Sequence, residues 1–154
     1  MNPCREEIRS IMLSTNKIDG VYYLLSRRMG LKANTLALLY ALDDGKVHSQ
    51  KQICEEWLIP KTTLNTIVRE CVAEGYITLI SEEHTREKVI QLTDKGKVYA
   101  DKILGKVYQA EQNAMARTLK EYSSEFIAGL EAFATHLCEE FDHEFDHEFA
   151  EMER

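Results

Sequence analysis

No apolar run in the 154-residue sequence approaches the roughly 18 residues that a membrane-spanning helix needs. The first ten residues are charged, unlike a signal peptide. Also missing are a glycine-rich phosphate loop, a GxSxG elbow and an HExxH pattern, which are motifs of phosphate-binding, hydrolase and metalloprotease sites. We therefore expect a cytoplasmic protein that is not an enzyme, and we assign it no catalytic residue, no metal ligand and no cofactor.

Cysteines are few, and none of the four stands at a CxxC or zinc-binding spacing. A cytoplasmic protein keeps such thiols reduced. Cys54 and Cys71 fall at inward positions of two predicted helices, where we expect small core residues. Cys4 would sense oxidants only if the nearby Arg5 and Arg9 lowered its pKa.

A net charge of −7 disfavours binding to an acidic partner, but the excess of acidic side chains is confined to one end of the chain. Residues 139–154 hold eight acidic side chains and one basic, whereas residues 45–97 hold eight of each sign. The whole chain, 44% hydrophobic and 29% charged, has the composition of one compact globular domain. A neutral segment with its basic residues grouped on one side still binds phosphate. Its electrostatic contribution to the binding free energy is modest and falls as the salt concentration rises.

The centre of the chain predicts two short helices joined by a tight turn. Ser49 is placed to cap the first helix, and Leu58 and Ile59 form the turn. Pro60 fits the first position of a second helix that runs to about Ala73, because its missing N–H would be unpaired there anyway. Spacings of 3, 4 and 7 give this helix an inward stripe, made of Leu64, Ile67, Val68 and Cys71.

A β-hairpin is predicted directly after the second helix. Gly75 closes that helix, and residues 76–80 and 88–92 alternate as two strands around a charged tip. A helix followed at once by such a ribbon offers two probes for neighbouring DNA grooves. The order predicts a winged helix-turn-helix, although a plain helical hairpin has the same two helices.

Long amphipathic helices flank this centre. One is expected over residues 4–29, bent near 16–20, and a shorter supporting helix over residues 33–42. Thr93 caps a long helix, which is followed after a break at 121–124 by a final helix. These apolar faces exceed what a short DNA-reading module needs for its own core. We therefore expect a second copy of the chain to cover them about a two-fold axis.

Three stretches together resemble the MarR family of bacterial transcription regulators. They are the run SQKQICEEWLIPKTTLNTIVRECVAEGYI, the tip residue Arg86 and the LTDKG motif that begins at Leu92. In that family a tip arginine stands six residues before an L-T-x-x-G motif, and Arg86 keeps this interval. The family often has an aspartate where His84 stands here, so the bracing of the tip arginine would fall to Glu83 or Glu87.

The resemblance implies a mainly α fold with a small β-hairpin wing. It implies a single MarR-like domain over residues 1–154, with the winged helix-turn-helix at 33–97 and dimerisation helices at 1–30 and 98–154. It also implies a homodimer that sets two recognition helices about one DNA turn, roughly 34 to 36 Å, apart on a pseudo-palindromic operator.

Candidate DNA contacts come from the start of the first central helix, the second helix and the wing. They are Gln50, Lys51, Lys61, Thr62, Thr63, Asn65, Thr66, Arg69, His84, Thr85, Arg86 and Lys88. Asn65, Arg69 and the neighbouring Thr63 and Thr66 are expected at base edges, and the residues around Lys61 and Lys51 at phosphates. Arg86 is placed to enter a minor groove.

Many members of the family bind a small aromatic or phenolic effector between the first two helices and the long helix after the wing. By that resemblance, the ligand-binding residues here are Tyr22, Tyr23, Arg27 and Tyr40, with Arg27 meeting a carboxylate. The alternative is that these tyrosines are ordinary core residues.

We therefore predict a DNA-binding transcriptional regulator, a repressor that acts as a homodimer and responds to a ligand. Two alternatives stay open: a winged-helix interaction module that does not bind DNA, and a thiol-based redox-sensing regulator. The FDHE repeat at 141–149 places His143 and His147 one helical turn apart, which suits zinc or nickel, or else is a packing stripe of phenylalanines.

Overall fold

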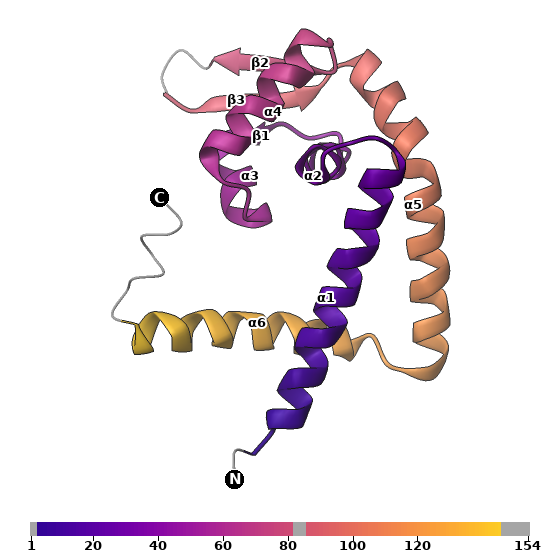
Figure 1. Ribbon diagram of the computed structural model, residues 1–154, viewed down its shortest axis with the longest axis vertical. Coiled ribbons are helices and arrows are strands. Elements are labelled where there is room, and N and C mark those ends of the chain that lie inside the picture. Colours follow the sequence, from indigo (N-terminus) through magenta and orange to yellow (C-terminus); the bar gives the residue numbers. More distant parts are fainter. Residues whose placement is uncertain (1–2, 82–85, 146–154) are drawn as a thin grey trace.

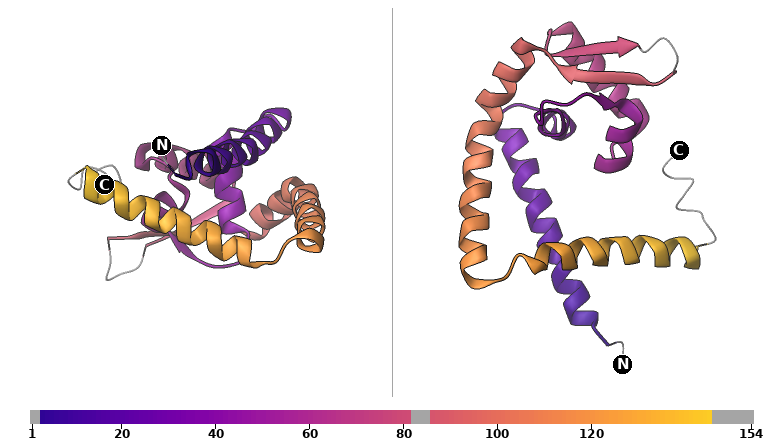
Figure 2. Two further views of the ribbon diagram at one scale, coloured as in Figure 1. Left: turned by 90° about the horizontal axis from the view of Figure 1, so that it is seen from below. Right: turned by 180° about the vertical axis from the view of Figure 1, so that it is seen from behind.

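The computed structural model describes residues 3–81 and 86–145. Its elements in chain order are α1 (Arg5–Arg28), α2 (Ala33–Leu42), β1 (His48–Ser49), α3 (Gln50–Trp57), α4 (Lys61–Ala73), β2 (Ile77–Ser81), β3 (Lys88–Leu92), α5 (Asp94–Glu121) and α6 (Glu125–Glu144). The elements from α2 to β3 form a lobe, from which α1 and α5 both extend (Figure 1). The view from behind in Figure 2 shows the same arrangement. Helix α6 begins near the far end of α5 and runs across the direction of α1.

Two hydrophobic clusters meet at α2, which is apolar almost all round. Leu38 and Leu42 pack with the inward residues of α3, α4 and the sheet, and both are almost fully buried. Leu36 and Leu39 pack instead against α5, around Leu104. Because α2 belongs to both clusters, it joins the winged lobe to the long helices.

The wing is part of a three-stranded antiparallel sheet in the order β1-β3-β2. The two predicted strands are confirmed, with Ile77 paired with Leu92 at one end and Ser81 with Lys88 at the other. Strand β1 was not predicted from the sequence. It is two residues long, too short to show an alternating pattern, and it forms because His48 pairs with Ile90.

The predicted helices are present, and α1 is continuous through residues 16–20. The start of one helix differs from the prediction. Pro60 precedes α4 instead of opening it: its ψ of 138° is extended, and its carbonyl accepts the N–H of Leu64 at 2.9 Å. The proline therefore serves as the N-cap residue, one position earlier than predicted.

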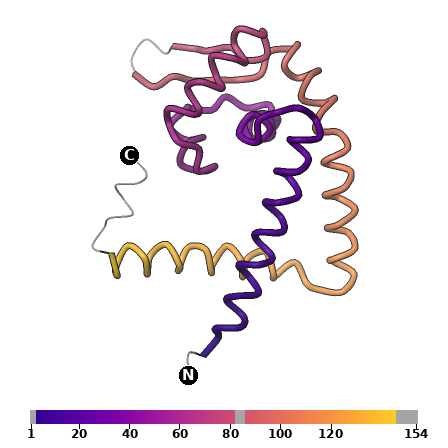
Figure 3. The backbone as a smooth tube through the Cα atoms, viewed as in Figure 1, coloured from indigo at the N-terminus to yellow at the C-terminus, as the bar shows by residue number. Residues whose placement is uncertain are grey.

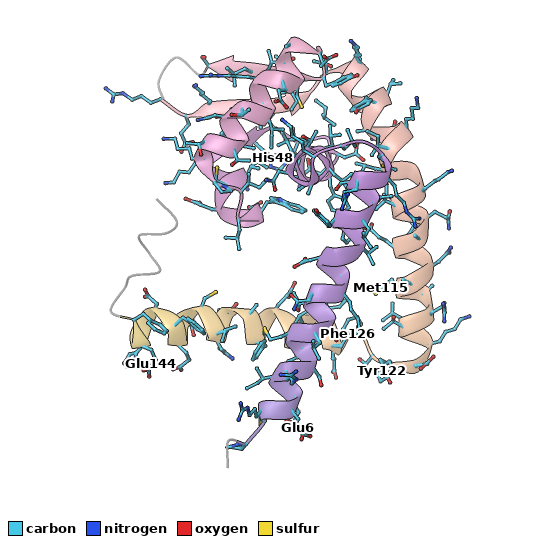
Figure 4. All side chains as sticks on the ribbon, in the orientation of Figure 1. Glu6, His48, Met115, Tyr122, Phe126 and Glu144 are labelled. Carbon is cyan, nitrogen blue, oxygen red and sulfur yellow. The ribbon has the colours of Figure 1, made fainter. Side chains whose placement is uncertain are left out.

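The chain enters along α1, folds through the lobe and leaves along α5 (Figure 3). Helix α6 has no buried residue, although its sequence carries a regular apolar stripe. Tyr122 and Phe126 lie near the turn between α5 and α6, and Met115 lies further back along α5 (Figure 4). Within residues 3–81 and 86–145, no helix combines the length and apolar character needed to cross a membrane.

Candidate nucleic-acid interface and effector cavity

Helix α4 divides into a buried face and an open face, as its sequence predicted. The inward residues Leu64, Ile67, Val68 and Cys71 are all buried. On the other side Thr62, Thr66 and Arg69 are exposed, and Asn65 is half-buried. The Thr66 hydroxyl donates to the Thr62 carbonyl at 3.1 Å, so its oxygen can still accept a hydrogen bond.

The turn before α4 is fixed by local backbone geometry. The Ser49 hydroxyl accepts the N–H of Gln52 at 3.0 Å, which confirms it as the cap of α3. At the other end of α3, Leu58 adopts a left-handed conformation with φ 49°, which turns the chain within three residues toward α4. The Leu58 side chain is 77% exposed, whereas the adjoining Ile59 is buried and anchors the turn to the core.

A groove of about 660 Å³ runs between α3, α4 and the wing. Six of the predicted DNA contacts line it: Gln50, Lys51, Lys61, Asn65, Arg86 and Lys88. Four of these six are cationic, against two acidic lining residues, Glu55 and Glu87. The fold therefore sorts the charges of a neutral segment, so that its groove is net positive.

The other predicted contacts lie outside this groove. Thr62, Thr66 and Arg69 are exposed on α4, and Thr63 is half-buried there. His84 and Thr85 lie outside the described residues, as does Glu83. Within the described part of the chain Arg86 forms no ion pair, so Glu87, which lines the same groove, does not brace it.

The LTDKG motif forms the joint between the sheet and α5. The Thr93 hydroxyl accepts the N–H of Gly96 at 2.9 Å, capping α5, and donates to the Gly75 carbonyl at 2.5 Å. The Thr93 N–H donates to the Tyr76 carbonyl at 3.0 Å. A Cβ at Gly96 would lie 1.9 Å from that carbonyl oxygen, so the close approach requires glycine. The stacked rings of Tyr76 and Tyr99, with centroids 4.1 Å apart, complete the joint.

A second cavity, of about 520 Å³, lies between α1, α2, α5 and the end of α3. Tyr22, Tyr23 and Tyr40 line it, as the resemblance implied. Arg27 does not: it is exposed, two residues beyond the half-buried Leu25, and is not among the lining residues. Arg27 lies one helical turn beyond Tyr23, the last residue of α1 that lines the cavity, so the cavity ends before it.

Sequence reasoning missed several residues at this cavity. Trp57, Asp19 and Asn34 line it, and Glu111 of α5 lies behind its tyrosines. Nothing in the local sequence shows that the end of α3, where Trp57 lies, faces α1. A carboxylate 89 positions away from Tyr22 leaves no local signal at all.

Glu111 accepts hydrogen bonds from two phenols. Tyr22 donates to its Oε1, and Tyr40 donates to its Oε2 at 3.3 Å. Burial, together with these contacts to Glu111, raises the pKa of both tyrosines above the usual value. Both phenols therefore stay protonated as donors throughout the neutral range.

A polar network ties α5 to the turn after α2. The Tyr108 hydroxyl donates to Asp43 Oδ2 at 2.7 Å, and Lys97 Nζ lies 2.7 Å from Asp43 Oδ1. The Asp43 side chain is only 3% exposed, and each of its two carboxylate oxygens has one of these partners. This network holds α5 in register with the winged lobe.

The cysteines divide by location. Cys71 is buried, and burial raises its pKa to about 11, which confirms it as a core residue and keeps it a thiol. Cys54 is half-buried at the groove, and burial raises its pKa as well. Cys4 and Cys138 are exposed. Across residues 3–81 and 86–145 no metal-binding group of His, Cys, Asp and Glu occurs, and His147 of the FDHE repeat lies outside those residues.

This combination of a helix pair, an antiparallel wing and long flanking helices defines a winged-helix protein. Residues 29–87 match the model of the MarR family. No match was found among curated proteins. The chain has the fold of MarR transcription regulators, which, with the matched segment, confirms the resemblance predicted from the sequence.

Three solved structures illustrate this likeness. NMB1585, a MarR family regulator from Neisseria meningitidis, is 24% identical, with a TM-score of 0.75 over 94% of this chain and 99% of its own. SPO1453, a MarR family transcriptional regulator from Silicibacter pomeroyi DSS-3, is 18% identical, with a TM-score of 0.69 over 84% and 93%. NadR in complex with 4-hydroxyphenylacetate is 12% identical, with a TM-score of 0.65 over 83% and 89%.

Proposed function

We propose that the protein is a sequence-specific DNA-binding repressor, which acts as a homodimer in the cytoplasm and releases DNA when a small ligand binds. The observation that carries this proposal is the open face of α4 beside a groove lined by four cations, from Lys51 to Lys88. An exposed helix face next to a positive groove suits a recognition helix in a major groove with phosphates alongside.

The side chains divide into readers and anchors. Asn65 and Arg69 on α4 are the base readers, because Asn pairs with adenine and Arg with guanine through two hydrogen bonds each. Lys61, Lys51 and Gln50 anchor the backbone, and the N-terminal N–H groups of α4 add partial positive charge there. Arg86, exposed at the wing, enters the minor groove.

The exposed apolar side chains of the long helices support dimerisation. Val21 and Leu24 of α1 are 63% and 59% exposed, and large side chains of α6 such as Leu130 are about half exposed. Large apolar side chains left exposed along helices in this way are typical of a surface that another chain covers. A second copy packed about a two-fold axis covers α1 and α6 of both chains and sets two α4 helices on one side of the dimer.

Ligand response rests on the cavity between α1, α2 and α5. Its volume of about 520 Å³ is within the usual range for small-molecule sites, about 300–1,000 Å³. Its walls connect the winged lobe with the helices proposed to dimerise, so a ligand there changes the spacing of the two α4 helices. The structure of NadR with 4-hydroxyphenylacetate supports a small-molecule effector for proteins with this fold.

DNA binding is tested by selecting, from fragments of the source genome, those that the purified protein retains, and by titrating a recovered duplex at several salt concentrations. If all eight groove cations of a dimer meet phosphates, log K falls against log salt with a slope of at most about −7. A specific duplex bound with a steep slope supports the regulator. Failure to bind any duplex at low salt contradicts it and favours the interaction module.

A further inference from the structure

The cavity between α1, α2 and α5 has aromatic walls. The rings of Tyr40 and Trp57 are 5.6 Å apart and inclined at 63°, and those of Tyr22 and Tyr40 are 6.4 Å apart at 77°. Rings at such steep angles present both faces and edges to the space that they enclose. Ring faces carry negative charge density, which attracts organic cations, Trp most strongly.

Glu111 strengthens the attraction of these rings for a cation. Its carboxylate accepts hydrogen bonds from the hydroxyls of both Tyr22 and Tyr40, which makes the two rings more negative. The phenols are neutral donors already bound to a carboxylate, so they are not free to donate to a ligand anion. An anion in the cavity would therefore contact the negative faces of these rings, and neither Tyr22 nor Tyr40 would have a hydroxyl proton free to donate to it.

The charged groups at the cavity are negative. Among the described lining residues Asp19 is the one charged side chain, and none is Lys, Arg or His. The first turn of α2, at Ala33 and Asn34, also borders the cavity and has the partial positive charge of a helix N-terminus, about half a unit. The full negative charge of Asp19 exceeds it, and Arg27, which was predicted to bind a carboxylate, lies elsewhere.

We propose that this cavity takes an organic cation with an apolar body, such as an arylammonium, and not an aromatic carboxylate. The ammonium group lies against Tyr40 and Trp57 within reach of Asp19, and the apolar part packs toward Leu36, Leu104 and Val107. This deepens the proposed function by naming the effector class, and it rests on that function only in treating the cavity as the effector site.

Trp57 is the only tryptophan in the chain and lines the cavity, so its fluorescence reports binding directly. Three probes separate charge from shape: phenyltrimethylammonium, its uncharged isostere tert-butylbenzene, and benzoate. The full-length protein without DNA is titrated with each. We expect saturable quenching by the ammonium and at least about tenfold weaker binding of both other probes. Benzoate binding as tightly as the ammonium would overturn the proposal.

Variants assign the effect to the cavity. Asp19→Asn, at an exposed position that tolerates the change, is expected to weaken ammonium binding about fivefold and leave tert-butylbenzene unchanged. Glu121→Gln, at the exposed far end of α5, removes an equal charge outside the cavity and should change neither affinity. Tyr40→Leu should weaken ammonium binding about tenfold. Equal effects of Asp19→Asn on both probes would contradict a charge-based site.

The same titrations distinguish this proposal from the function on which it rests. Ammonium binding by a protein that retains no duplex leaves the cation site intact and removes the repressor. Specific DNA binding without saturable ammonium quenching leaves the repressor and removes the cation site. Where both bind, phenyltrimethylammonium should lower the affinity for the duplex, and benzoate at the same concentration should not.

Discussion

Replacing Gly96 by alanine tests the joint between the wing and α5. The new Cβ would lie 1.9 Å from the Tyr76 carbonyl oxygen, whereas an ordinary contact begins at 3.4 Å. The new Cβ is attached directly to the backbone and the Tyr76 carbonyl is part of it, so removing the clash requires α5 and the sheet to separate by about 1.5 Å. The Thr93 N–H bond to Tyr76, now 3.0 Å, then breaks, and the hydroxyl bond from Thr93 to Gly75 is lost with it.

The expected cost follows from these contacts. Each hydrogen bond contributes about 1 kcal/mol, and the Tyr76–Tyr99 stack contributes about another 1 kcal/mol if it is disrupted. The higher helix propensity of alanine offsets less than about 1 kcal/mol of this cost, because Gly96 lies in the first turn of α5. We expect Gly96→Ala to lower the free energy of unfolding by about 2 kcal/mol, and to lower the urea midpoint by about 1 M.

Gly105 provides a matched control on the same helix. Nothing lies within 4 Å of a Cβ built there, so Gly105→Ala should stabilise the protein by up to about 1 kcal/mol. Urea unfolding is followed by circular dichroism at one protomer concentration, because unfolding of a dimer depends on concentration. If Gly96→Ala proves as stable as the wild type, or matches Gly105→Ala, the proposed close approach is wrong.

Three further predictions concern the groove and the polar network. Arg86→Ala should weaken operator binding and reduce the salt slope by about 1 per protomer without unfolding the protein, whereas Arg117→Ala on α5 should do neither; equal effects would exclude the wing from binding. Asn65→Ala should change sequence preference by about 1 to 3 kcal/mol at one base pair, seen in selected sequences; a uniform loss would indicate a phosphate contact. Burial and the bond to Asp43 raise the pKa of Tyr108, so its stabilisation is fully present below about pH 10 and is lost as pH rises toward the raised value. The stability difference between wild type and Tyr108→Phe, about 1 kcal/mol at pH 8 in urea titrations, should therefore shrink above pH 10, and a constant difference would contradict the assignment.

Local patterns predicted the elements well. The bounds of α2 and the capping roles of Ser49 and Thr93 are confirmed, and so is the inward stripe from Leu64 to Cys71. Each depends on spacing or hydrogen bonding within a few residues, which the sequence displays directly. The resemblance to the MarR family added the expected effector residues and the division into a DNA-binding region and dimerisation helices.

The site was only partly predictable. Six of the predicted DNA contacts line the positive groove. Four of them were predicted from their places on the two helices, and Arg86 and Lys88 from their place in the hairpin. The lining of the candidate effector cavity was predicted less well: Tyr22, Tyr23 and Tyr40 line it, but Arg27 does not, and Trp57 and Glu111 were missed. Their positions depend on how α3 and α5 approach α1, which no local pattern specifies.

The sequence by itself determined which residues form helices and strands and which faces are apolar, because these follow from short-range sterics and hydrogen bonding. The tertiary structure alone decided that a neutral segment forms a cationic groove and that Glu111 meets Tyr22 and Tyr40 across 89 and 71 positions. Charge acts through distance in space, and packing sets that distance independently of separation along the chain.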